Sequence, residues 1–75
     1  MILSLREIGR RCKQYRVEHG YYQADVAEET GYSIENISSF ETGRNDNARI
    51  LLWYFAHGMK YKNLIERGAN NGDDI

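Results

Sequence analysis

The sequence has one cysteine, no proline and no long apolar run. The single cysteine and the short apolar runs each exclude a class of protein. A single cysteine cannot form an internal disulfide, which favours a reducing, cytoplasmic compartment. The longest apolar run, residues 50–56, is far shorter than the roughly 20 residues that cross a bilayer. Charge begins at Arg6, too early for the apolar segment of a signal peptide. We therefore expect a soluble cytoplasmic protein that does not bind a membrane.

Sequence patterns typical of catalytic or metal-binding sites are also missing. Cys12 falls on the apolar face of the first predicted helix, which indicates a buried structural thiol rather than a nucleophile. His19 and His57 each stand at a predicted helix C-terminus, where a charged imidazole interacts favourably with the helix dipole. The sequence contains no glycine-rich phosphate loop, EF-hand loop or Ser-His-Asp combination. We therefore predict that the protein is not an enzyme and holds no cofactor or metal.

Positive charge is missing from the middle of the chain. Residues 1–19 and 44–67 each carry five basic and two acidic residues, a net charge of +3. Residues 20–43 have a net charge of −5, from Asp25, Glu28, Glu29, Glu35 and Glu41. A surface that binds nucleic acid normally shows a basic stripe. The charge pattern alone therefore does not decide whether the middle segment binds DNA or another partner.

Hydrophobic spacing and glycine positions predict one all-helical domain over residues 1–67. The 75 residues are too few for a second domain. Ser4 and Glu7 form a capping-box pattern before the first helix, whose apolar face is Leu5, Ile8, Cys12 and Tyr15. Glycines follow the predicted helices as stop signals. The predicted helices are residues 5–19, 23–30, 33–42, 48–57 and 61–67, and residues 68–75 form a polar tail that we expect to be disordered.

Three quoted stretches carry a family resemblance: "IGRRCKQYR", "GYYQADVAEETGYSIENISSFETG" and the apolar helix before "YKNLI". Together they resemble the lambda-repressor-like (Cro/cI, XRE) helix-turn-helix family over about residues 5–67. The matching positions are Ile8, Gly9 and Arg16, then Gln23, Val26, Ala27 and Gly31, then Ile37, Glu41 and Gly43. The resemblance implies a compact five-helix domain, and the helical spacing places Val26, Ala27, Ile37 and Phe40 on its inward side. The resemblance also implies an ion pair between Arg16 and Glu41, which makes Arg16 a fold residue rather than a DNA contact.

The resemblance further implies a small phage- or mobile-element-type repressor that binds double-stranded operator DNA as a homodimer. Residues 33–42 would lie in the major groove. By position, the DNA contacts would be Gln23, Ser33, Ile34, Glu35, Asn36, Ser39, Thr42 and Arg44. Glu35 would accept from a cytosine amino group, Ile34 would pack on a thymine methyl, and Ser39 would bond either way. The alternative for each of these three is a solvated position.

Two further features keep a second function open. Tyr22 stands where the family favours a small helix cap, and Asp46 stands where it often has a basic phosphate contact. Arg10, Arg11, Lys13, Arg44 and Arg49 would offset the acidic segment if they lay on the DNA side. The alternative is a protein-binding module on the same fold, such as an antirepressor, an antitoxin or an inhibitor of a nucleic-acid-handling enzyme.

The fourth predicted helix is apolar around most of its circumference. The seven consecutive apolar residues of "ILLWYFA" exceed what one helix face buries in so small a domain. We therefore expect a homodimer or partner interface drawn from Leu51, Trp53, Tyr54 and Phe55.

Overall fold

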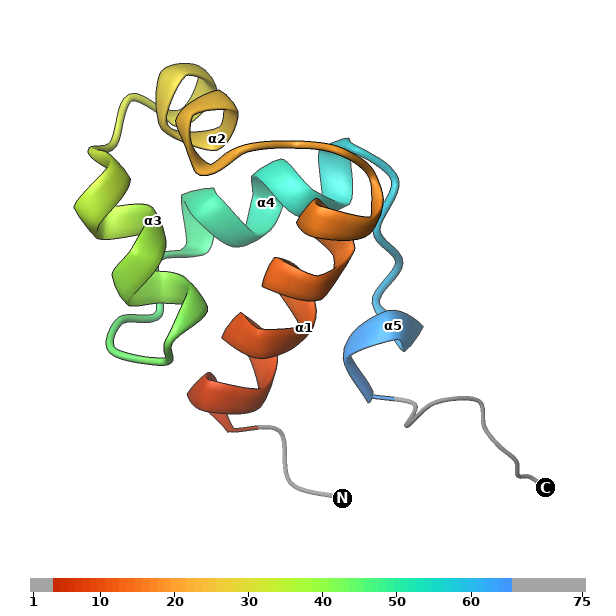
Figure 1. Cartoon of the computed structure of the whole chain (residues 1–75). Coiled ribbons are helices and arrows are strands. Elements are labelled where there is room, and N and C mark those ends of the chain that lie inside the picture. The colour runs from red at the N-terminus through yellow and green to blue at the C-terminus, as the bar shows by residue number, and fades with distance from the viewer. Residues whose placement is uncertain (1–3, 66–75) are drawn as a thin grey trace, which may run out of the picture.

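The computed structural model describes residues 4–65, and in that range the chain is entirely helical (Figure 1). The helices are α1 (Leu5–Glu18), α2 (Gln23–Thr30), α3 (Ile34–Glu41), α4 (Ala48–Ala56) and α5 (Lys62–Ile65). This confirms the all-α class and the compact five-helix architecture. Helices α1 and α4 each end one residue before the predicted boundary, with His19 and His57 as C-caps. The predicted end of the last helix and the tail 68–75 lie outside the described residues.

Helix α1 packs against α3, α4 and α5, while α2 packs against α3 and α4 (Figure 1). All five helices and the segment before α5 contribute to one core. Its buried apolar members are Cys12, Val26, Ile37, Phe40, Ile50, Trp53, Tyr54, Met59 and Leu64. The predicted inward positions Val26, Ile37 and Phe40 are therefore confirmed, and Ala27 packs against this core from a partly buried position. Leu5, by contrast, is exposed at the first position of α1.

Side chains that accept backbone N–H groups start three of the helices. Ser4 accepts from the Glu7 N–H at 3.0 Å, and Ser33 and Asn47 begin α3 and α4 in the same way. The structure shows only this half of the capping box predicted for α1. The Glu7 carboxylate accepts instead from Arg10 at 2.5 Å and from Arg11 at 2.7 Å. These hydrogen bonds lower the pKa of Glu7 because they favour its charged form.

Helices α1 and α3 cross very closely at Gly9. A Cβ atom at this position would lie 2.3 Å from the Phe40 carbonyl oxygen and 2.6 Å from that of Glu41. Only glycine allows the two backbones to approach to this distance. The family resemblance rests in part on the pair Ile8 and Gly9, and the close crossing of α1 and α3 gives the physical reason for a glycine there. In the described part of the chain, no helix has the length and hydropathy to cross a membrane.

Candidate nucleic-acid interface

Helices α2 and α3 are joined by residues 31–33, and this turn sets the position of α3. Gly31 has φ +81°, a left-handed conformation that glycine adopts without strain. Ser33 then caps α3 by accepting from the Asn36 N–H at 3.2 Å. One face of α3 enters the core through Ile37, Phe40 and Glu41. None of the helices in residues 4–65 covers the opposite face, and its polar side chains are exposed (Figure 1).

Most of the predicted DNA-contacting residues lie on this accessible face or at its ends. Ser39 is half-buried because the chain after α3 folds back over it: the Arg44 N–H donates to the Ser39 carbonyl at 2.8 Å. Asn45 Nδ2 also donates to the Asn36 carbonyl at 3.4 Å. The exposed predicted residues are Ser33, Ile34, Glu35, Asn36, Thr42 and Arg44, with Ile34 48% exposed. Ser38 is exposed as well, although the sequence analysis did not select it.

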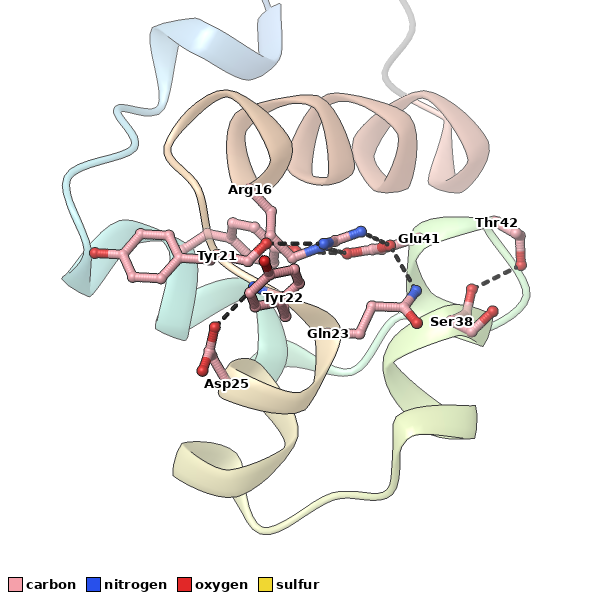
Figure 2. A network of polar contacts seen from close by, with 9 residues as sticks. Arg16, Tyr21, Tyr22, Gln23, Asp25, Ser38, Glu41 and Thr42 are labelled. Carbon is pink, nitrogen blue, oxygen red and sulfur yellow. Dashed lines mark hydrogen bonds and ion pairs between the residues drawn. The ribbon is translucent and has the colours of Figure 1, made fainter.

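Thr42 closes the C-terminal end of α3 with its own hydroxyl group. Its Oγ1 donates to the Ser38 carbonyl at 3.0 Å and lies 3.2 Å from the Ser39 carbonyl (Figure 2). The hydroxyl proton is therefore used within the helix, and the oxygen lone pairs remain for an external donor. This limits Thr42 to accepting hydrogen bonds from a ligand.

Gln23 requires a correction, because its side chain is not directed at the surface. It is half-buried at the start of α2, and its Nε2 donates to Glu41 Oε1 at 3.0 Å (Figure 2). The expected phosphate contact by this side chain is therefore replaced by a contact inside the fold. The cap of α2 also differs from expectation. Tyr22 supplies no side-chain cap, but Asp25 Oδ2 accepts from the Tyr22 N–H at 2.7 Å.

Glu41 is the centre of a buried polar network beneath this surface. Arg16 Nε donates to Glu41 Oε2 at 2.7 Å and Nη2 to Oε1 at 3.1 Å, which is the ion pair that the resemblance implied (Figure 2). The Tyr54 hydroxyl donates to the same carboxylate at 2.8 Å. Arg16 Nη1 also donates to the Tyr21 carbonyl at 3.0 Å. The network therefore fixes α3 to α1, to α4 and to the start of α2.

The buried charge of Glu41 also acts on the groups around it. Its hydrogen bond to Arg16 raises the pKa of that guanidinium. Burial, together with the Glu41 charge, raises the pKa of Tyr54 and raises that of Cys12 to about 12. Cys12 is fully buried and its thiol stays protonated at neutral pH, as expected of a structural cysteine. In residues 4–65, no group of His, Cys, Asp and Glu residues is arranged to hold a metal ion.

Most of the acidic segment is engaged in contacts within the protein. Asp25 accepts from the Tyr22 N–H, and Glu41 is neutralised by Arg16. Glu29 Oε1 accepts from Trp53 Nε1 at 2.6 Å and lies 3.2 Å from His57 Nε2. Only Glu28 and Glu35 remain exposed and without a polar contact to the described residues. Because Arg16 neutralises Glu41, the net charge of −5 over residues 20–43 overstates by one the negative charge presented to a partner.

Several basic side chains, in contrast, make no polar contact within the described residues. Arg44 lies three positions after Glu41, the last residue of α3. The start of α1 lies against the neighbouring Gly43, where a Cβ would be 2.5 Å from the Arg6 Cα. Arg10 and Arg11 are engaged by Glu7. The basic residues without such contacts are Arg6, Lys13, Arg44, Arg49, Lys60 and Lys62.

The predicted interface on α4 needs revision. Trp53 is 6% exposed and Tyr54 is fully buried, so both belong to the core rather than to an interface. Leu51 and Phe55 are only partly buried, and Leu52, which the sequence analysis did not select, is 60% exposed. The outer face of α4 consists of Ala48, Leu51, Leu52, Phe55 and Ala56, with the exposed Arg49 at its edge. This face is opposite the buried residues Ile50, Trp53 and Tyr54 by helical spacing, once their burial is known.

No protein-family model, curated protein or solved structure matches this chain.

Proposed function

We propose that this protein is a small transcriptional regulator with a lambda-repressor-like helix-turn-helix fold, which binds operator DNA as a dimer. The observation that carries the proposal is the placement of α3. Its apolar side and Glu41 are held in the core, while Ser33, Glu35, Asn36 and Ser38 face solvent. A short helix that is anchored to the core on one side and polar on the other has the form required for reading bases in the major groove.

The structure presents less negative charge on α2 and α3 than the sequence alone indicates, and this favours DNA binding. Glu41 is neutralised by Arg16 and adds little repulsion against phosphate, whereas Asp25 and Glu29 are bonded to neutral donors and keep their negative charge. Arg44 and Arg6, at the C-terminal end of α3, are available for phosphate contacts. Such contacts supply affinity, while the α3 side chains supply sequence preference.

The outer face of α4 is the proposed dimer contact. Over two helical turns it presents alanine, leucine and phenylalanine, with the exposed Arg49 at its edge. If two copies pack antiparallel about a two-fold axis at Leu52, Ala48 of one copy lies opposite Ala56 of the other. Small residues on both sides of a central leucine allow the helices to approach closely, as an isologous contact requires.

Substitutions that separate base contacts from phosphate contacts test the proposal. Arg44→Gln is expected to weaken binding to every duplex and to lower the slope of log affinity against log salt by about one. Ser39→Ala and Glu35→Gln are expected to change the preferred bases instead. Gln14→Ala, on the exposed side of α1, is the matched control and leaves both properties unchanged. If Arg44→Gln alters sequence preference, or the α3 variants alter nothing, α3 is not the reading helix.

The second candidate is a protein-binding module, favoured by one specific observation. Tyr22 is 74% exposed, and Glu28 on α2 and Glu35 on α3 are exposed carboxylates without a polar contact to the described residues. An exposed aromatic with carboxylates on the same helix pair suits a basic protein surface. Under this alternative, Tyr22→Ala and Glu28→Gln abolish binding to the partner, and no duplex DNA is bound at low salt.

A further inference from the structure

His57, the C-cap of α4, contacts three other parts of the fold. Its ring stacks on Trp53 at a centroid distance of 3.9 Å and an angle of 23°, and it meets the Tyr21 ring edge-on at 5.4 Å. Its backbone carbonyl accepts from the Tyr15 hydroxyl at 2.7 Å. The third contact is with Glu29 on α2. His57 therefore lies where α1, α2, α4 and the link between α1 and α2 meet.

Both nitrogens of the His57 ring face oxygen atoms that can only accept hydrogen bonds. Nδ1 lies 2.8 Å from the Trp53 carbonyl oxygen, and Nε2 lies 3.2 Å from Glu29 Oε1. A neutral imidazole carries one N–H group, so it can donate to only one of these oxygens. The charged ring carries two N–H groups and matches both. The surroundings of His57 are therefore built for the protonated form.

We infer that His57 is a proton-dependent clasp that holds the C-terminal end of α4 against α2. Among the described residues, the titratable groups that contact it are Glu29 from α2, Tyr15 from α1 and Tyr21 from the link. Tyr15 contacts the His57 carbonyl through its hydroxyl and Tyr21 contacts the ring edge-on, so neither offers a carboxylate to the ring nitrogens. Glu29 is thus the charged group that attracts the protonated ring of His57. The same Glu29 oxygen accepts from Trp53 Nε1, which keeps it in place.

The direction of the pH effect follows from this geometry. Both ring contacts can be made only by the charged ring, so the stabilisation is present when the ring carries its second proton and is lost when the ring is neutral. The side chains of His57 and Glu29 are 26% and 56% exposed, so solvent screens part of the attraction. We therefore expect a change of only about two- to fivefold in the unfolding equilibrium constant.

The chain contains its own control in His19. The His19 ring stacks on Tyr15 at 3.9 Å and 21°, and its Nδ1 lies 2.9 Å from the Tyr15 carbonyl oxygen. It thus repeats the local arrangement of His57 and Trp53 at the end of α1. It differs because no carboxylate among the described residues contacts its ring. His19→Gln therefore removes the same local contacts without removing the clasp.

Urea unfolding at about pH 5.5 and pH 8 tests the clasp, and it needs no DNA. His57→Gln is expected to raise the unfolding constant two- to fivefold more, relative to wild type, at the lower pH than at the higher one. His19→Gln is expected to show a smaller dependence on pH, because it removes only the interaction of a charged ring with the helix dipole. Glu29→Gln keeps an acceptor for Trp53 but offers an N–H to the neutral ring, so it is expected to lose the low-pH gain. A pH-independent effect of His57→Gln would overturn the inference.

Tryptophan fluorescence provides a second readout that does not depend on unfolding. Trp53 is the only tryptophan in the chain, so its emission reports on the stacked His57 ring. We expect the emission of the folded wild type and of His19→Gln to change between pH 5 and 8, and that of His57→Gln to stay constant. A transition that persists in His57→Gln would assign the proton to another group and contradict the clasp.

Discussion

At the residue scale, the Glu41 carboxylate joins α1, α2 and α4 inside the core. It accepts from Arg16, Gln23 and Tyr54, and it is 4% exposed. Glu41→Gln removes the charge that balances the buried Arg16 guanidinium, and it replaces one acceptor oxygen with a donor. We expect a loss of about 3–5 kcal/mol in the free energy of unfolding, because an uncompensated buried charge is costly.

Urea unfolding at pH 7 measures this loss, with Glu28→Gln as the matched control. Glu28 has the same charge and lies in the same acidic segment, but it is exposed and makes no contact with the described residues. Its substitution is expected to change stability by less than about 0.5 kcal/mol. Equal effects of the two substitutions would show that the Glu41 network does not hold α3 in place.

Several contacts between single residues could not be predicted from the sequence pattern. The ion pair between Arg16 and Glu41 was reached only by resemblance, because no periodicity links positions 25 residues apart. The inward turn of Gln23 follows from that pair, since its amide completes the hydrogen bonding of the same carboxylate. The contacts of Glu29 with Trp53 and His57 depend on how α2 packs on α4. Such partners are set by helix packing and not by local sequence.

At the element scale, the crossing of α1 and α3 depends on the missing side chain of Gly9. Gly9→Ala would gain up to about 1 kcal/mol of helix propensity in isolation. Its Cβ would nevertheless lie 2.3 Å from the Phe40 carbonyl oxygen, so the two helices must separate. We expect a net loss of about 1–3 kcal/mol, because overpacking of backbone against backbone cannot be relieved by rotamer changes.

Thermal unfolding of Gly9→Ala beside Gln14→Ala checks this prediction. Gln14 lies on the exposed side of α1, so its substitution tests alanine in the same helix without the crossing. We expect the control to keep the wild-type melting temperature within a few degrees. An increase in melting temperature for Gly9→Ala would mean that α1 and α3 are not closely packed there.

Helix positions were the part of the fold that the sequence predicted well. Polar caps and glycines are local signals, and the helices begin and end within one residue of expectation wherever the described range covers them. The orientation of α4 was harder, because its run of apolar residues does not reveal which side faces the core. Trp53 and Tyr54 were therefore assigned to an interface, although the packing of α1, α2 and α3 buries them.

At the scale of the whole molecule, the outer face of α4 leads to a prediction about self-association. Leu52→Lys places a charge at the centre of the proposed two-fold contact, where it would be buried against its own copy. We expect the wild type to sediment as a dimer and this variant as a monomer. Val17→Lys is the matched control, since Val17 is 59% exposed on α1, and it leaves the dimer intact. A wild type that remains monomeric at high concentration would exclude this interface.

The most direct test of the central claim, that α3 reads DNA, is a selection from randomised duplex DNA with the purified protein at about 50 mM salt. The account predicts an enriched inverted repeat whose half-sites are about one helical turn apart, since the reading helices of a dimer enter successive major grooves. The same selection with Glu35→Gln should return a repeat altered at the contacted position. If no sequence is enriched and bulk duplex is not bound, the protein does not recognise DNA.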